Sequence, residues 1–252
     1  DHPAPGRLAR LTGVTVTTTD ASDPDPGAPP PAGELLEAVT ELGEALRRAL
    51  AASVSTAASP AELRQAARDV RRATELLTAT PRPRSHLSPL DDMSRGIRVF
   101  NPVVGVGSGI AVPLAYERDG DGVLVRTELG QAYEGPPTYL HGGVAALLMD
   151  QVLGYGAIVA GRWGMTVDLR LRYRRPVPLH TPLRLTARVS ETSGRRTTVL
   201  GGIAADDAPD TPLVEATGIF VSPSAEVADQ YFGAVRNGAG EPVDGRLGTG
   251  PR

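Results

Sequence analysis

A single carboxylate lies in the middle of an apolar stretch of this chain. Between residues 144 and 160 the polar side chains are those of Asp150, Gln151 and Tyr155. If this stretch is a helix, only small or apolar residues lie one turn from Asp150. Because burial disfavours the charged form of a carboxyl group, we expect Asp150 to be a stronger base than a surface aspartate. It is a candidate catalytic base; the alternative is a structural aspartate that accepts hydrogen bonds from a neighbouring loop.

The start of the same stretch could hold a developing negative charge. His141, Gly142 and Gly143 fall where the helix should begin, and the first N–H groups of a helix have no partner within it. The two glycines let a substrate atom approach those donors, so Gly143 is a candidate substrate-binding residue. The positive end of the helix dipole favours an oxyanion there. Alternatively, the glycines serve only the tight turn that follows Pro136 and Pro137, and His141 is a packing residue.

The distance between these two features predicts an oligomer. Gly142 and Asp150 are eight residues apart, about 12 Å along a helix that rises about 1.5 Å per residue. An oxyanion donor and a base that act on one carbonyl group must both lie about 3 Å from it. Two antiparallel copies of the helix, related by a two-fold axis, could meet this requirement. If the site is real, the protein is at least a dimer.

The composition narrows the classes of function. The chain has 252 residues and a formal net charge of −3, which gives a nucleic-acid partner no support. It contains no cysteine, and its four histidines lack the spacing of metal ligands, so we expect no metal and no cofactor. No uninterrupted apolar run approaches the roughly 18 residues of a membrane span. The first residues do not resemble a signal sequence, and we expect a cytoplasmic protein.

Apolar residues at helical spacing predict two amphipathic helices within residues 33–81, joined by a short turn. Ser59, Pro60 and Glu62 stand where an N-cap, a first-turn proline and a capping-box acid belong, so the second helix should begin there. This N-terminal helical hairpin has an apolar stripe that needs a partner, either the main domain or another subunit.

The segments around the hairpin differ in composition. Residues 1–32 are rich in proline, aspartate and glycine and are expected to be a linker or mobile arm. Residues 82–104 are expected to be an irregular connector. A main domain should occupy residues 105–222, and residues 223–252 are expected to be a weakly ordered tail.

The pattern of the main domain changes from helical spacing to alternation. Two strand-like runs precede the apolar helix and four follow it, with turns at Gly120, Gly194 and residues 206–210. An apolar helix must be enclosed, and one sheet curled around it is the simplest solution. The predicted fold class is α+β, with an antiparallel six-stranded sheet wrapped round a central helix. The runs cover residues 109–119, 122–129, 165–177, 182–193, 195–205 and 211–223.

Two stretches of this domain resemble a known family. "YEGPPTYLHGGVAALLMD" and "GMTVDLRLRYRRPVPL" are similar to the hot-dog-fold acyl-CoA thioesterases of the PaaI type, in particular to the subgroup that contains mitochondrial long-chain acyl-CoA thioesterases. The resemblance covers about residues 105–222. The His-Gly-Gly, the aspartate nine positions after the histidine and the Thr-Val-Asp-Leu strand recur in order. The resemblance implies a hot-dog fold, a homodimer whose sheets join edge to edge, and thioester hydrolysis at that interface.

The resemblance also implies roles for single residues. Gly142 would donate its N–H to the thioester carbonyl, and His141 would orient the loop or the substrate. Asp150 of the partner subunit would be the base or the nucleophile, and both alternatives stay open. Thr166 would position the attacking water or the carboxylate, although it could also be an ordinary β-branched strand residue. Many relatives have an asparagine where this chain has Gly135, but the mitochondrial subgroup shares the "EGPP" form.

Clustered arginines are candidates for binding the phosphates of coenzyme A, because a guanidinium group can bind phosphate through two hydrogen bonds. In "VDLRLRYRR" the arginines alternate with Leu169, Leu171 and Tyr173, so they share one face of a strand, which we expect to be solvated. Arg195 and Arg196, beside a turn, are the better candidates for substrate binding.

The sequence therefore predicts an enzyme that hydrolyses acyl-CoA thioesters to a free acid and coenzyme A. We expect it to act as a homodimer or a dimer of dimers. The alternative is a non-catalytic acyl-CoA binding or sensing module on the same fold, which would not need Asp150. A dehydratase is disfavoured, because the usual pairing of a histidine with a second acid or amide on the central helix is missing.

Overall fold

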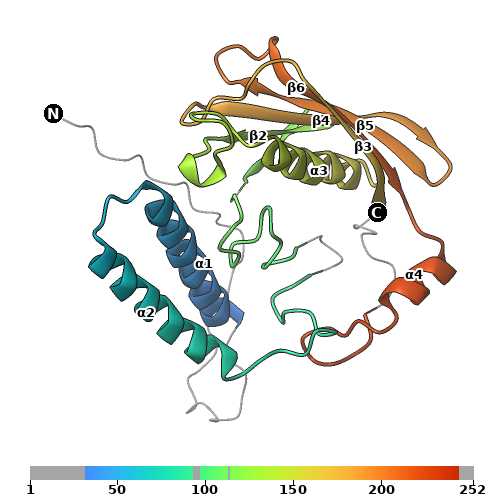
Figure 1. Ribbon diagram of the computed structural model, residues 1–252. Coiled ribbons are helices and arrows are strands. Elements are labelled where there is room, and N and C mark those ends of the chain that lie inside the picture. The colour runs from blue at the N-terminus through green and yellow to red at the C-terminus, as the bar shows by residue number, and fades with distance from the viewer. Residues whose placement is uncertain (1–31, 93–96, 113, 244–252) are drawn as a thin grey trace. The chain divides into compact units, whose positions relative to one another are not determined.

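The computed structural model describes residues 32–92, 97–112 and 114–243 (Figure 1). Its sheet has the strand order β1-β2-β4-β5-β6-β3, and every neighbouring pair is antiparallel, which confirms the predicted sheet. The strands are β1 (Tyr116–Asp119), β2 (Gly122–Thr127), β3 (Met165–Tyr173), β4 (Leu183–Ser193), β5 (Arg196–Ala205) and β6 (Pro212–Val221). The helices are α1 (Ala32–Ser55), α2 (Pro60–Thr78), the short 3₁₀ helix η1 (Gln131–Tyr133), α3 (Gly142–Val159) and α4 (Ala225–Phe232).

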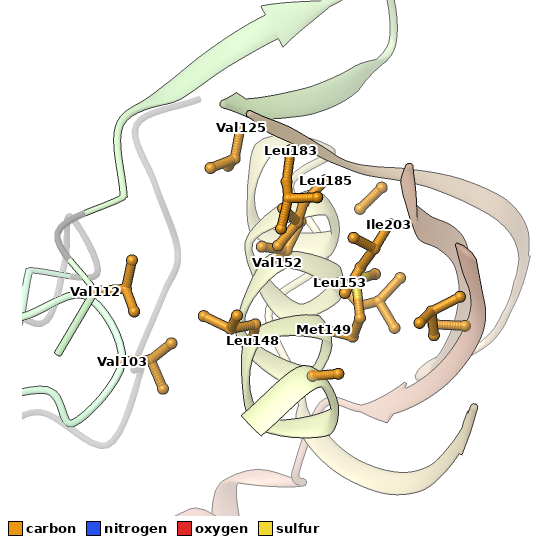
Figure 2. Close-up of a cluster of buried hydrophobic side chains, with 14 of the residues drawn as sticks. Val103, Val112, Val125, Leu148, Met149, Val152, Leu153, Leu183, Leu185 and Ile203 are labelled. Atoms are coloured by element: carbon orange, nitrogen blue, oxygen red, sulfur yellow. The ribbon is translucent and has the colours of Figure 1, made fainter. Parts of the chain in front are cut away.

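Helix α3 is the centre of the hydrophobic core. Its Met149, Val152 and Leu153 are fully buried against the sheet, where they meet side chains such as Leu185 and Ile203 (Figure 2). Each such side chain contributes about 1.5–3 kcal/mol through removal of apolar surface from water. The burial explains why an almost wholly apolar helix forms in this position. A six-stranded antiparallel sheet around a central helix is the hot-dog fold expected from the sequence.

The opposite side of α3 is covered by the segment that leads into the sheet. Val103 and Val112 from this segment lie beside Leu148 of the helix (Figure 2). The sequence had suggested a strand from residue 109, whereas β1 begins only at Tyr116. Burial of Val112 against the helix accounts for the difference, because this part of the chain crosses the core and does not pair with the sheet.

Helix α1 is fastened to residues 105–108 at two points. The guanidinium group of Arg47 donates to the carbonyl oxygens of Val106 and Ser108, at 2.9 and 2.8 Å. Gly43 permits the close approach, because a Cβ there would lie 2.1 Å from the Val106 carbonyl oxygen. One face of the first predicted helix therefore packs on the main domain.

Helix α2 begins as predicted, with Ser59 as its N-cap and Glu62 completing a capping box. None of its side chains is buried in the single chain. Leu63 is 47% exposed and Val70 is 59% exposed. Within the described ranges no segment covers this stripe, so the partner expected for it is not supplied by the described part of one chain.

The described part of the C-terminal segment, up to residue 243, contains a helix and contacts with the connector. Ser224 caps α4 by accepting a hydrogen bond from the Val227 N–H. Beyond the helix, Arg236 exchanges backbone hydrogen bonds with Ser85 and Leu87 of the connector, at 2.9 and 2.8 Å. These bonds satisfy backbone groups that a loose tail would leave to water. Residues 1–31 and 244–252, which belong to the expected arm and tail, lie outside the described residues.

Among the described helices, α3 alone has the length and composition of a membrane span. The enclosed core helix of a globular domain has the same composition, and α3 packs along the sheet in this way.

Candidate active site

The carboxylate of Asp150 is held by a hydroxyl group from the sheet. Thr166 Oγ1 donates a hydrogen bond to Asp150 Oδ1 at 2.9 Å. In the single chain Asp150 is half-buried and Thr166 is exposed, so the full enclosure expected for Asp150 is not reached. The reason is local, since this side of α3 is open and the neighbouring Leu147 is 43% exposed. This bond is compatible with one of the two roles that the resemblance implied for Thr166, positioning of the carboxylate, which stays a prediction.

A β-bulge brings Thr166 to the side of the sheet where Asp150 lies. The β3–β6 register shifts between Thr166 and Asp168, so Thr166 pairs with the buried Phe220 and Leu169 pairs with Gly218. Residues three apart on a regular strand point to opposite faces. The extra residue, Val167, restores both Thr166 and Leu169 to the face that covers α3.

The other polar side chains of α3 have structural partners. Gln151 Oε1 accepts a hydrogen bond from Asn101 Nδ2 at 3.1 Å, which connects the helix to the connector. The ring of Tyr155 stacks on the ring of Tyr116, with 3.9 Å between their centroids. Asp150 is therefore the polar group of this helix that faces the open side and is available for chemistry.

His141 is the N-cap of α3. Its Nδ1 accepts a hydrogen bond from the Gly143 N–H at 3.0 Å, so the ring carries its proton on Nε2 in this geometry. The His141 N–H in turn donates to the Tyr133 carbonyl oxygen at 2.9 Å. These contacts fit the predicted role of His141 in orienting the loop. They also show that the Gly143 N–H is engaged, so any contribution of Gly143 to substrate binding comes from its lack of a side chain.

The N–H of Gly142 is the free donor of the first turn. Among the described residues it has no hydrogen-bond acceptor, as expected for the first residue of a helix. A hollow of about 360 Å³ lies beside it, lined by residues that include Tyr139, Tyr173 and Arg175. The hollow leaves room for a substrate carbonyl group to approach this donor at the positive end of α3.

Gly135 supports the same turn by its small size. A Cβ at this position would lie 2.7 Å from the His141 Cα, so a larger residue cannot occupy it unless the backbone moves. The Gly135 N–H donates to the Tyr139 carbonyl oxygen at 2.9 Å, which closes the loop before the helix. The loop packs so closely against His141 that this position has no room for an asparagine side chain.

Tyr173 is a contact that the sequence reasoning did not single out. Its Oη donates to the Gly142 carbonyl oxygen at 2.7 Å. The alternation of the strand had placed Tyr173 on the same face as Leu169 and Leu171, which the register confirms. Alternation alone gave no indication that this face reaches the start of α3.

The free N–H of Gly142 and the carboxylate of Asp150 are two halves of a candidate site, and they lie apart within one chain. Gly142 lies in the first turn of α3, whereas Asp150 lies eight residues further along the same helix. Strand β3 is an edge strand, and no described segment pairs with its outer side. Met165 and Val167 on this edge are 41% and 56% exposed.

Arg195 and Arg196 lie at the end of the sheet near Thr166. Arg196 pairs with Val221, and Val221 pairs with Met165 on its other side. The following residue, Thr197, is buried on the α3 side, so Arg196 points away from α3. Both arginines are exposed, and their role in binding phosphate stays a prediction.

No three histidine, aspartate or glutamate side chains in the described ranges are grouped closely enough to hold a metal ion. The groups that can act here are a carboxylate, hydroxyl groups and a backbone amide.

Comparison with known proteins identifies the class. The thioesterase superfamily model matches residues 138–209, a range that contains Gly142, Asp150 and Thr166. The crystal structure of protein RHA08564, described as a thioesterase superfamily protein, is 35% identical, with a TM-score of 0.64. That match covers 73% of this chain and 94% of the other. The chain belongs to the thioesterase superfamily.

Among curated proteins, the chain is similar to the acyl-coenzyme A thioesterase THEM4 of two vertebrates. The protein from Xenopus laevis is 29% identical over 116 residues, which are 46% of this chain and 51% of that protein. The protein from Mus musculus is 32% identical over 92 residues, which are 36% of this chain and 39% of that protein. The chain thus spans about half or less of the curated relatives that it matches.

Proposed function

We propose that this protein hydrolyses acyl-CoA thioesters at a site shared by two copies of the chain. The observation that supports this most directly is the carboxylate of Asp150, fixed by Thr166 at 2.9 Å on the open side of an otherwise apolar helix. Burial of a charge is costly unless it is hydrogen-bonded, and Thr166 supplies such a bond to Asp150. Membership of the thioesterase superfamily and the names of the THEM4 relatives support acyl-CoA as the substrate class.

The proposed interface joins the open side of α3 to its counterpart in a second copy. Gly143 and Leu147 are exposed there, between Gly142 and Asp150. An isologous contact centred near Leu147 would place Gly142 of one copy opposite Asp150 of the partner subunit. The unpaired edge of β3 would then meet its own copy, which would remove an exposed edge strand.

In this arrangement the reaction needs few groups. The thioester carbonyl oxygen accepts the hydrogen bond of the Gly142 N–H. Asp150 of the partner subunit removes a proton from water as the water oxygen attacks the carbonyl carbon, and the Gly142 N–H stabilises the oxyanion that forms. Collapse of this intermediate breaks the C–S bond and releases the carboxylic acid and the thiolate of coenzyme A, which takes up a proton. Direct attack by the carboxylate, through a mixed anhydride that water then hydrolyses, would use the same geometry.

A complementation experiment tests both the chemistry and the shared site. Asp150→Asn removes the base and keeps the shape of the side chain. Gly142→Pro removes the N–H and adds a ring whose Cβ would stand 3.5 Å from the Tyr173 hydroxyl oxygen, an ordinary contact. Proline suits this first helical position because the preceding His141 is extended, with φ −64° and ψ 130°. We expect each variant by itself to lose turnover by at least about 100-fold while the chain still binds coenzyme A.

Mixed dimers of the two variants should recover activity. In a mixed dimer, one site combines an intact Gly142 with an intact Asp150, and the other site lacks both groups. Random exchange of subunits should therefore restore about one quarter of the wild-type activity. Absence of recovery in dimers shown to have mixed would reject the shared site. Full turnover in Asp150→Asn would reject Asp150 as the catalytic group and point to another catalytic residue, whereas coenzyme A binding without turnover in the wild-type protein would favour the non-catalytic binding module.

A further inference from the structure

Tyr173 joins the end of β3 to the first residue of α3. Its hydroxyl group donates to the Gly142 carbonyl oxygen at 2.7 Å, and a Cβ added to Gly142 would stand 3.5 Å from the same hydroxyl oxygen. Tyr173 is 52% exposed, so the ring contributes little to the core. The hydroxyl group is thus not required for burial of the ring, and its direct structural effect is on the Gly142–Gly143 peptide.

The start of α3 needs such an anchor. Helix ends fray, and two consecutive glycines leave the backbone freer than other residues would. The His141 N–H is held by the Tyr133 carbonyl oxygen, and the Gly143 N–H is held by His141 Nδ1. These two bonds fix the N–H groups on either side of Gly142. The Gly142 N–H belongs to the His141–Gly142 peptide, whose carbonyl oxygen accepts from the Val144 and Ala145 N–H groups. The bond from Tyr173 fixes the carbonyl group of the Gly142–Gly143 peptide, so both peptides that flank the Gly142 Cα are held and the free N–H keeps a defined direction.

Strand β3 therefore acts on both halves of the site. Near its start, Thr166 holds the Asp150 carboxylate, and at its end Tyr173 holds the Gly142 backbone. Both hydroxyl groups lie on the face that covers α3, because of the bulge between Thr166 and Asp168. The relative position of acid and donor is set by one strand as well as by the helix.

We propose that Tyr173 is a positioning residue, which orients the Gly142 N–H toward the oxyanion of the transition state. The inference rests on the proposed function. An oxyanion donor acts mainly on the transition state, so a small misalignment lowers kcat more than it raises KM. Loss of a whole oxyanion-hole donor costs about 100-fold to 1,000-fold in kcat, and loss of its alignment should cost part of that.

Tyr173→Phe tests the proposal, because it removes only the hydroxyl group. We expect kcat for acyl-CoA hydrolysis to fall about tenfold with KM nearly unchanged. The second measurement needs no substrate: amide hydrogen exchange at Gly143, whose N–H is held by His141 Nδ1, should become faster when followed by NMR of the chain labelled at glycine. Tyr231→Phe is the control, because it also removes the hydroxyl group of an exposed tyrosine. Tyr231 lies on α4, is 60% exposed and has no hydrogen bond to α3 among the described residues.

Both effects together, confined to Tyr173→Phe, support the proposal. Unchanged kcat, unchanged exchange or an equal effect of Tyr231→Phe overturns it. A failure of the proposed function looks different, because the wild-type protein would then hydrolyse no acyl-CoA, whereas the exchange measurement would still show whether Tyr173 holds the turn.

Discussion

The hydrogen bond from Thr166 to Asp150 makes a quantitative prediction. Thr166→Val keeps the volume and the β-branched shape that suit a strand and removes the donor alone. A hydrogen bond to a charged group contributes about 1.5–3 kcal/mol in mutational series. Asp150 is only half-buried, so the lower end applies, because water can replace part of the lost bond. About 1.5 kcal/mol corresponds to about a tenfold fall in kcat/KM.

The assay can follow the free thiol of coenzyme A with a thiol-reactive dye, because the protein has no cysteine that would contribute to the signal. Thr166→Ser serves as the control, since it keeps the hydroxyl group and should retain most of the activity. In a protein that already carries Asp150→Asn, Thr166→Val should not lower kcat/KM any further, because Thr166 acts through the carboxylate. A full tenfold loss in that background would refute the reasoning, and so would an unchanged Thr166→Val enzyme.

Two other features give predictions about stability. Gly135→Ala places a Cβ 2.7 Å from the His141 Cα, so we expect the free energy of unfolding, measured in urea, to fall by about 1–3 kcal/mol and turnover to be reduced. Gly33→Ala is the control, because its Cβ meets nothing within 4 Å and should not destabilise the protein. Hydrogen bonds from the side chain and the backbone of Ser59 lower the pKa of Glu62 below its usual 4.5. The contribution of Glu62 to α2 is therefore present above its unfolded-state pKa and is lost as the pH falls through the lowered value. The protection factors of the amides in the first turn of α2, measured relative to intrinsic exchange at each pH, should fall in that acid range, and Glu62→Gln should abolish this change.

The architecture was predictable because it follows from apolar patterning. The stretch around Asp150 is apolar on all sides, which requires enclosure, and the alternating runs supply the sheet that encloses it. The start of α2 at Pro60 followed from residues that satisfy free N–H groups, and the start of α3 at Gly142 followed from the His-Gly-Gly that precedes the apolar run. Such local signals depend on neighbours in the sequence, so they are visible without coordinates.

The details of the site depend on features with no local signal. Strict alternation would place Thr166 on the face of Arg170 and Arg172, away from Asp150, and only the bulge at Val167 reverses this. The resemblance to a family indicated Thr166, whereas the spacing of its residues did not. Tyr173 reaches Gly142 across 31 positions of sequence, a contact set by how β3 crosses the helix.

The unpaired edge of β3 offers a way to inhibit the protein without touching its chemistry. A short extended peptide that added itself to this edge as a seventh strand would occupy the place proposed for the second copy. With the peptide bound, the chain would keep its fold, the Asp150 carboxylate and the free Gly142 N–H. The Asp150 carboxylate of a second copy would no longer face that N–H. Such a peptide would compete with self-association and not with the substrate, so its effect would weaken as the concentration of the protein rises.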